Sequence, residues 1–285
     1  MEIPKLPIGR LGEAGIHWIT IHLSSVLEGF GTAVTMLDNA FRWGLMLMPA
    51  PVLIAVIVAL AWDAAGAGTA AFAAIGLLIV WNQGLWVATL DTLALVLTAA
   101  LLSLVIAIPL GIAIAESRRV RIVVTPLLDF LQTMPRFVYL IPAVMILGID
   151  VAPAVFATIT LAMVPPIRIT AVGIAEVDRK LVEAGEAMGC SRWQLIRKVK
   201  LPLAMPAIML GVNQCLMMSL SMVIIASLIG ASGLGDEILR AIGRLDAGNG
   251  IMAGLAVFVL AIVLDRITRG WAERIPRAQR TAARP

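Results

Sequence analysis

Long apolar runs, interrupted by short charged segments, make up most of this chain. Each run is close to the roughly 20 residues that a helix needs to cross about 30 Å of hydrocarbon. The runs lack the strict apolar–polar alternation that is typical of a membrane β-barrel. The pattern therefore predicts an all-α membrane protein. It predicts about seven transmembrane helices, at residues 44–62, 65–81, 92–115, 126–148, 152–175, 207–231 and 250–267.

The segment before these runs, residues 1–43, has a different pattern. Apolar residues at helical spacing, among them Ile16 and Leu23, are mixed there with acidic residues such as Glu13 and Glu28. This mixture predicts an amphipathic helix that lies on the membrane surface. A basic start followed by a continuous apolar core is missing, so we do not expect a cleavable signal peptide.

Composition agrees with a membrane location. Of the 285 residues, 60% are hydrophobic and 14% are charged. The mean hydropathy of +0.98 lies outside the range of soluble domains. Cys190 and Cys215 are the two cysteines, and they predict neither a disulfide framework nor a metal site. His17 and His22 have no third ligand beside them in the sequence, so we expect no metal there either.

Lysine and arginine gather in three clusters, at residues 118–121, 179–200 and 266–284, within a net charge of +4. By the positive-inside rule such clusters face the cytoplasm. Counting crossings from the first two clusters places the N-terminus outside and the C-terminus in the cytoplasm, in agreement with the basic tail at 271–285. The clusters have no aromatic platform around them, which argues against a nucleic-acid partner.

The polar stretch at residues 176–202 is long enough to fold between two spans. It predicts two short helices, with Gly189 at positive φ in the turn and a capping box of Ser191 and Gln194. Pro202 is expected to end the second helix. The alternative is a solvated loop. A charged helix-turn-helix of this kind predicts a docking surface for another protein, with apolar contacts from Leu181, Ala184, Met188, Leu195 and Val199.

This stretch also resembles a known motif. Glu183-Ala-Gly185, then Gly189, then Val199-Lys-Leu-Pro202 is similar to the EAA loop of permeases in binding-protein-dependent ABC importers. Gly185 stands where that family usually has alanine, and Val199 where it usually has isoleucine. In the family the loop inserts a coupling helix into a cleft of the cytoplasmic ATPase. The resemblance implies ATPase coupling by Glu183, Ala184, Gly185, Gly189, Val199, Leu201 and Pro202.

Further segments resemble the glycine betaine, proline betaine and choline branch of these permeases, at residues 86–93, 132–142, 165–170, 201–214, 233–235 and 242–246. The resemblance implies a type I permease core at 85–270, with an accessory transmembrane pair at 44–84 and an extracytoplasmic segment at 1–43. It implies import of glycine betaine, proline betaine or a related quaternary-ammonium osmoprotectant across the bacterial inner membrane. Choline, carnitine or another small solute is the alternative. A secondary transporter is disfavoured, because the sequence shows no convincing inverted repeat.

The chain carries no signature of its own energy source. No G-x-x-x-x-G-K-[ST] motif occurs, and the glycine-rich segment at 230–235 has no lysine. No arrangement of catalytic side chains is apparent either, so we expect no enzyme activity and no cofactor on this chain. The resemblance implies that ATP-Mg binds a separate ATPase and that an extracytoplasmic binding protein delivers the solute. One docking loop per chain and two ATPase clefts favour a homodimer.

Candidate residues for the solute pathway come from polar and aromatic positions inside the predicted spans. The ring faces of Phe137 and Tyr139 suit a quaternary ammonium, although both could instead pack between helices. Arg136 falls about ten residues into the span at 126–148, where it needs water or a partner; with Asp129 and Gln132 it forms one polar ladder. Snorkelling or pairing with another helix is the alternative for Arg136. Asn213 is a further candidate, with helix packing as its alternative.

Overall fold

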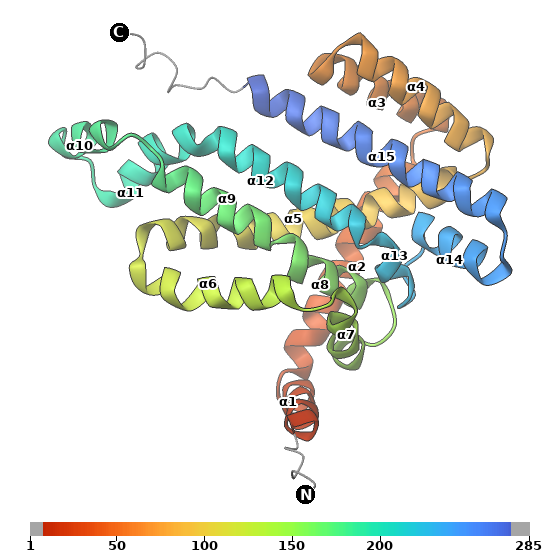
Figure 1. The fold of residues 1–285 in the computed structure, drawn as a ribbon, viewed down its shortest axis with the longest axis horizontal. Helices are drawn as coiled ribbons and strands as arrows, with labels where there is room; N and C mark the ends of the chain where they lie inside the picture. Colours follow the sequence, from red (N-terminus) through yellow and green to blue (C-terminus); the bar gives the residue numbers. More distant parts are fainter. Residues whose placement is uncertain (1–7, 275–285) are drawn as a thin grey trace, which may run out of the picture.

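The structure is a computed structural model that describes residues 8–274, and these residues are almost entirely helical (Figure 1). Residues 1–7 and 275–285 lie outside the description, and with them most of the predicted basic tail. Among the described residues, up to six spans are possible if each of two bent helix pairs is one span, where the sequence predicts about seven; α4 (Ala67–Asn82) is apolar but shorter. By length and composition, four helices are able to cross a membrane: Trp86–Glu116, Val151–Ala175, Arg192–Ser221 and Ala247–Arg274.

The centre of the fold is the long helix α5 (Trp86–Glu116). It is apolar on nearly every side, with no charged residue between Asp91 and Glu116, so other helices can cover it all round. It packs against a helix from the N-terminal segment and against three helices of the second half of the chain. These neighbours are α2 (Ser24–Met46), α8 (Val151–Ala162), α9 (Val164–Ala175) and α12 (Leu201–Ser221).

The predicted span at 44–62 is wrong at its start. The segment is split between α2 and α3 (Ala50–Ala65), which meet at a bend of 100°. Pro49 explains the break, because proline lacks an N–H and disfavours helical conformation in the residue before it. The N-terminal segment forms two helices, α1 (Ile8–His22) and α2. The side of α2 that carries Val34 and Asp38 is buried in the fold, where α2 packs against α5 and α8.

An antiparallel pair of helices, α3 and α4, packs on the last long helix, α15 (Ala247–Arg274) (Figure 1). The predicted span at 65–81 agrees with α4 to within two residues at its start. The helix has 16 residues, which is below the roughly 20 of a typical span. The contact between α3 and α15 is close: a Cβ at Gly270 would lie 2.1 Å from the Ala64 carbonyl oxygen.

The predicted span at 126–148 is also broken. Helix α6 (Arg118–Thr133) ends before Pro135, and the chain then forms the 3-10 turn η1 (Arg136–Tyr139) and α7 (Leu140–Leu147). The two halves are bent by 109°. Met134 is extended, with ψ of 140°, as expected for a residue that precedes a proline.

Pro202, in contrast, does not end a helix as the sequence predicted. Helix α11 (Arg192–Leu195), the π-helical turn η2 (Ile196–Lys200) and α12 follow one another without a break. In the π-turn the Leu201 N–H donates to the Ile196 carbonyl five residues back. The wider turn changes the hydrogen-bond register just before Pro202, which explains how the helix continues there.

We predict that Gly270→Ala lowers stability by about 1–3 kcal/mol, because the added methyl group meets the α3 backbone. The thermal unfolding midpoint of the purified protein in detergent measures this effect. Gly254→Ala on the same helix is the matched control, because a Cβ there meets nothing within 4 Å, and we expect its midpoint to stay the same or rise. Equal midpoints for the two variants would contradict the close packing of α3 on α15.

Candidate coupling and translocation sites

The polar loop folds as a compact helix-turn-helix, as the sequence predicts. Its first helix, α10 (Arg179–Ala187), is capped by Asp178, whose side chain accepts from the Lys180 N–H at 2.9 Å. Gly189 in the turn has φ of +79°. Ser191 and Gln194 form the reciprocal capping box that starts α11. Local capping chemistry therefore determines this element, and the predicted turn and capping box are confirmed.

Contact between the two short helices removes one of the predicted docking residues from the surface. Leu195 is buried, and a Cβ at Gly185 would lie 3.1 Å from its Cδ1 atom. The small residue at position 185 therefore lets the helices approach. Leu195 is not available to a partner, which corrects the prediction made from its spacing. The large apolar side chains that face outward are Leu181, Met188 and Trp193, with Met188 82% exposed. Of the other predicted docking residues, Ala184 is exposed and Val199 is half-buried.

The base of this helix-turn-helix is tied to the central helix. Lys200 Nζ donates to Glu116 Oε1 at 2.6 Å, and the two side chains are 17% and 30% exposed. Lys200 is the last residue of η2, and Glu116 is the last residue of α5. The helix-turn-helix is therefore connected both to α12, through the continuous helix, and to the end of α5, through this ion pair.

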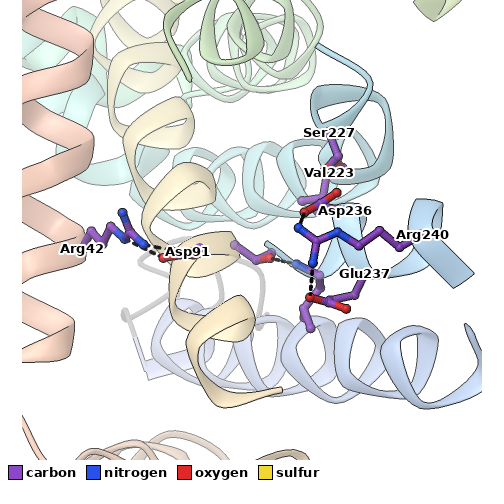
Figure 2. A network of polar contacts seen from close by, with 9 residues as sticks. Arg42, Asp91, Val223, Ser227, Asp236, Glu237 and Arg240 are labelled. Carbon is purple, nitrogen blue, oxygen red and sulfur yellow. Dashed lines mark hydrogen bonds and ion pairs between the residues drawn. The ribbon is translucent and has the colours of Figure 1, made fainter. Parts of the chain in front are cut away.

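A second polar contact holds the opposite end of α5 (Figure 2). Arg42 of α2 donates from Nε to Asp91 Oδ1 at 2.7 Å, while Asp91 itself is only 9% exposed. The neighbouring Thr92 accepts a hydrogen bond at 2.8 Å from the backbone N–H of Leu234, at the start of α14 (Leu234–Arg244). Figure 2 shows α2 and α14 on two sides of α5, so this end of α5 joins the N-terminal segment to the second half of the chain.

Helix α14 also packs against α13 (Val223–Ser227). A Cβ at Gly235 would lie 2.5 Å from the Val223 carbonyl oxygen, so the glycine permits close contact there. On the exposed side of α14, Arg240 pairs with Asp236 and Glu237, as Figure 2 shows.

The structure separates the predicted pathway residues into two groups. Gln132, Arg136 and Phe137 are exposed in the protomer, whereas Tyr139 and Asn213 are buried. Tyr139 packs in the largest apolar cluster and donates its hydroxyl to the Leu131 carbonyl. The packing alternative therefore holds for Tyr139 in this structure.

Asn213 is a contact between helices in this structure. It is fully buried, donates to Asp265 Oδ1 of α15 at 2.9 Å and accepts from the Thr268 hydroxyl. Asp265 also accepts from Arg269 at 2.8 Å. These bonds join α12 to α15, as expected for polar residues that pair at membrane depth.

Arg136 does not lie within a continuous span, which corrects its predicted position. It begins the turn η1 at the bend between α6 and α7, and its guanidinium donates to Ser221 Oγ at 3.1 Å. Asp129, which the sequence placed in a ladder with Arg136, pairs instead with Arg168 of α9. Sequence reasoning missed Arg168, although an arginine inside the predicted span at 152–175 is a signal that could have found it.

Comparison with known proteins identifies the fold and the family. The family model of the binding-protein-dependent transport system inner membrane component matches residues 107–277. The chain belongs to this family. The match runs from the second half of α5 to α15 and includes the helix-turn-helix. This membership makes the chain an inner-membrane component of a transport system.

Three relatives cover nearly the whole chain. The glycine betaine/proline betaine permease ProW of Escherichia coli is 46% identical over 93% of this chain and 75% of its own length. The glycine betaine permease OpuAB of Bacillus subtilis is 42% identical over 94% and 95% of the two chains. The glycine betaine/carnitine permease GbuB of Listeria monocytogenes is 44% identical over 95% and 97%.

A chain of the MetNI methionine ABC transporter, solved in inward-facing conformations, has a similar fold. It superimposes with a TM-score of 0.61 at 20% identity, over 66% of this chain and 94% of that one. The predicted type I permease core is confirmed by this likeness. The described residues contain no group of three histidine, cysteine or acidic side chains placed to hold a metal ion.

We predict that Arg42→Leu destabilises this family member by about 1–3 kcal/mol, because it leaves the buried Asp91 carboxylate without its guanidinium. Adding Asp91→Leu should recover most of the loss, since both partners are then apolar. Thermal unfolding in detergent measures both variants. Arg240→Leu is the control, because its ion pairs are more exposed and contribute little. A double variant no more stable than Arg42→Leu alone would contradict this account.

Proposed function

We propose that this chain is the membrane-spanning permease subunit of an ATP-driven importer for glycine betaine, proline betaine or a related quaternary-ammonium solute. The observation that carries the proposal is the identity of 42–46% to glycine betaine permeases over 93–95% of the chain. Carnitine is the second candidate, because GbuB is named for glycine betaine and carnitine together. Both solutes carry a quaternary ammonium and a carboxylate.

Two soluble partners complete the proposed importer. A cytoplasmic ATPase dimer binds ATP-Mg and receives α10 and α11 in its clefts, and an extracytoplasmic binding protein delivers the solute. Two copies of this chain supply the two docking elements that an ATPase dimer needs. The outward-facing Met188 and Trp193 are suited to insertion into an apolar cleft, because both are large and exposed at the tip of the helix-turn-helix.

Coupling follows from how the helix-turn-helix is attached. When ATP draws the ATPase subunits together, each subunit moves the α10–α11 element that is docked on it. The continuous helix from α11 through η2 to α12 transmits this movement into the membrane core. The Lys200–Glu116 pair transmits it to α5. The two copies then alternate between pathways open to either side of the membrane.

Orientation follows from charge and from tryptophan. The exposed side chains of Trp62 and Trp271 lie close to the contact between Ala64 and Gly270, near the C-terminal end of α15. Trp43 lies near the end of α2, just before α3 starts, and Trp81 lies near the end of α4. Tryptophan is enriched at both membrane interfaces, and arginine on the cytoplasmic side. These features support a cytoplasmic position for Arg274 and an outside position for the N-terminal helices, with α2 close to the membrane plane because of its 100° bend from α3.

Reconstitution of the complex in vesicles tests the proposed function. With the ATPase and the binding protein present, we expect ATP-dependent accumulation of labelled glycine betaine and competition by unlabelled proline betaine. A non-hydrolysable ATP analogue is the control and should abolish accumulation. A complex whose ATPase activity responds to the binding protein but which accumulates no quaternary-ammonium solute would overturn the substrate class and leave the permease role intact.

The turn at Gly189 gives a test of coupling. Its φ of +79° is strained for a branched side chain, and a Cβ there meets nothing within 4 Å, so Gly189→Val acts through the backbone alone and costs about 1–2 kcal/mol locally. We expect transport and stimulated ATP hydrolysis to fall while membrane insertion is kept. Gly189→Asn is the control, because asparagine tolerates positive φ. If the Val and Asn variants transport at equal rates, the assigned coupling role is wrong.

A further inference from the structure

Helix α6 has three different faces. A helix that only separates lipid from a protein core needs two, one for each. One face is buried in the core around Leu128, and a second is apolar and exposed. The exposed apolar face carries Val123, Leu127 and Phe130. The third face is polar and recurs every three or four residues along the helix, at Arg121, Thr125, Asp129 and Gln132. We call these four residues the α6 polar stripe.

The α6 polar stripe extends to membrane depth. Asp129 lies eleven residues after Arg118, or about 16 Å along the helix axis, and Arg168 lies seven residues before the end of α9, or about 10 Å. Charged side chains at such depth are strongly disfavoured in contact with lipid and face a partner or water instead. The apolar face of α6 is suited to lipid, whereas the stripe is not.

An exposed ion pair lies on this stripe. Arg168 pairs with Asp129 at 2.5 Å, yet the two side chains are 38% and 58% exposed. The Nε atom of Arg168 is buried and has no hydrogen-bond partner. Beside the pair lies a pocket of 340 Å³ that Arg121, Thr125 and Arg168 line together with apolar residues of α5, α6 and α9.

Within the described part of the chain, other helices do not enclose the stripe. Helix α6 packs against α5, α8 and α9, whereas the additional pair α3 and α4 packs on α15, away from α6 (Figure 1). A second copy of the chain is suited to cover this face, because its own α6 polar stripe then lies opposite the first one. Val123 and Leu127 remain in contact with lipid. The two facing stripes then enclose an aqueous space.

We propose, on the basis of the proposed function, that the α6 polar stripe lines the solute pathway between two copies, and that Asp129 and Arg168 bind the two charges of a zwitterionic solute. The Asp129 carboxylate attracts the quaternary ammonium, which has no N–H to donate. The Arg168 guanidinium, which is 38% exposed, receives the carboxylate in a charge-assisted pair. Exchange of the protein's own ion pair for the solute's two charges keeps the site neutral at membrane depth.

Thiol labelling tests whether the stripe faces water, whatever the solute is. In a Cys190→Ser background of the complex, Thr125→Cys and Gln132→Cys should react about tenfold faster with a cationic, membrane-impermeant methanethiosulfonate than Val123→Cys and Leu127→Cys. Cys215 is fully buried and does not interfere. Equal labelling of the two sets would overturn the pathway face. Because no solute is used, this arm gives its answer even if the proposed substrate is wrong.

Transport by variants of the ion pair tests the solute role. Arg168→Gln should lower glycine betaine uptake about tenfold, the effect of one lost charge-assisted contact, while ATP hydrolysis stays responsive to the binding protein. Asp63→Asn is the matched control, because it removes another exposed pair between helices, with Arg274 at 2.8 Å, and uptake should not change.

The variant Asp129→Leu combined with Arg168→Leu separates solute binding from a structural role. A merely structural ion pair can be replaced by two apolar residues with function kept. A solute-binding pair cannot, so we expect the double variant to assemble and hydrolyse ATP without transporting. Normal uptake by the double variant, or by Arg168→Gln, would overturn the assignment.

Discussion

The absence of hydrogen-bonding partners in a lipid bilayer is the constraint on which this fold depends. Each polar side chain at membrane depth must be paired inside the protein or must face water. The Arg42–Asp91 pair and the Asn213–Asp265 bond meet this demand inside the fold, where they join α2 to α5 and α12 to α15. The exposed Asp129–Arg168 pair between α6 and α9 is kept away from lipid only if another surface encloses the pair. The same rule therefore explains the packing of the helices and supports the proposal that a second copy of the chain covers the α6 polar stripe.

The proposed coupling has a second requirement, namely that movement of the α10–α11 element reaches the membrane core. The helix that leaves the loop continues into α12 through a π-helical turn, and Lys200 connects the loop to the end of α5. At the other end of α5, Asp91 and Thr92 hold α2 and α14. The central helix thus connects the α10–α11 element at one end to α2 and α14 at the other, which supports the proposal that it couples the two sides of the membrane.

Features that depend on local sequence could be predicted, and those that depend on tertiary contacts could not. The helix-turn-helix was predictable because the Gly189 turn and the Ser191 capping box act within a few residues. Long apolar runs likewise predicted the unbroken helices around 92–115, 152–175 and 250–267, but not the bends within 44–62 and 126–148. The positions of the prolines alone do not predict which helix breaks. The chain bends at Pro135 but continues as a helix through Pro202, where a π-turn precedes the proline. The burial of Asn213 depends on α15, which lies far away in the sequence.

A cryo-electron microscopy map of the complex with its ATPase would test the central claim most directly. The account predicts two copies of this chain related by a two-fold axis, with α10 and α11 of each copy in an ATPase cleft. It also predicts that the α6 polar stripes of the two copies face each other across a water-filled space. A map in which these stripes contact lipid, or in which a single copy of the chain binds the ATPase dimer, would contradict the account.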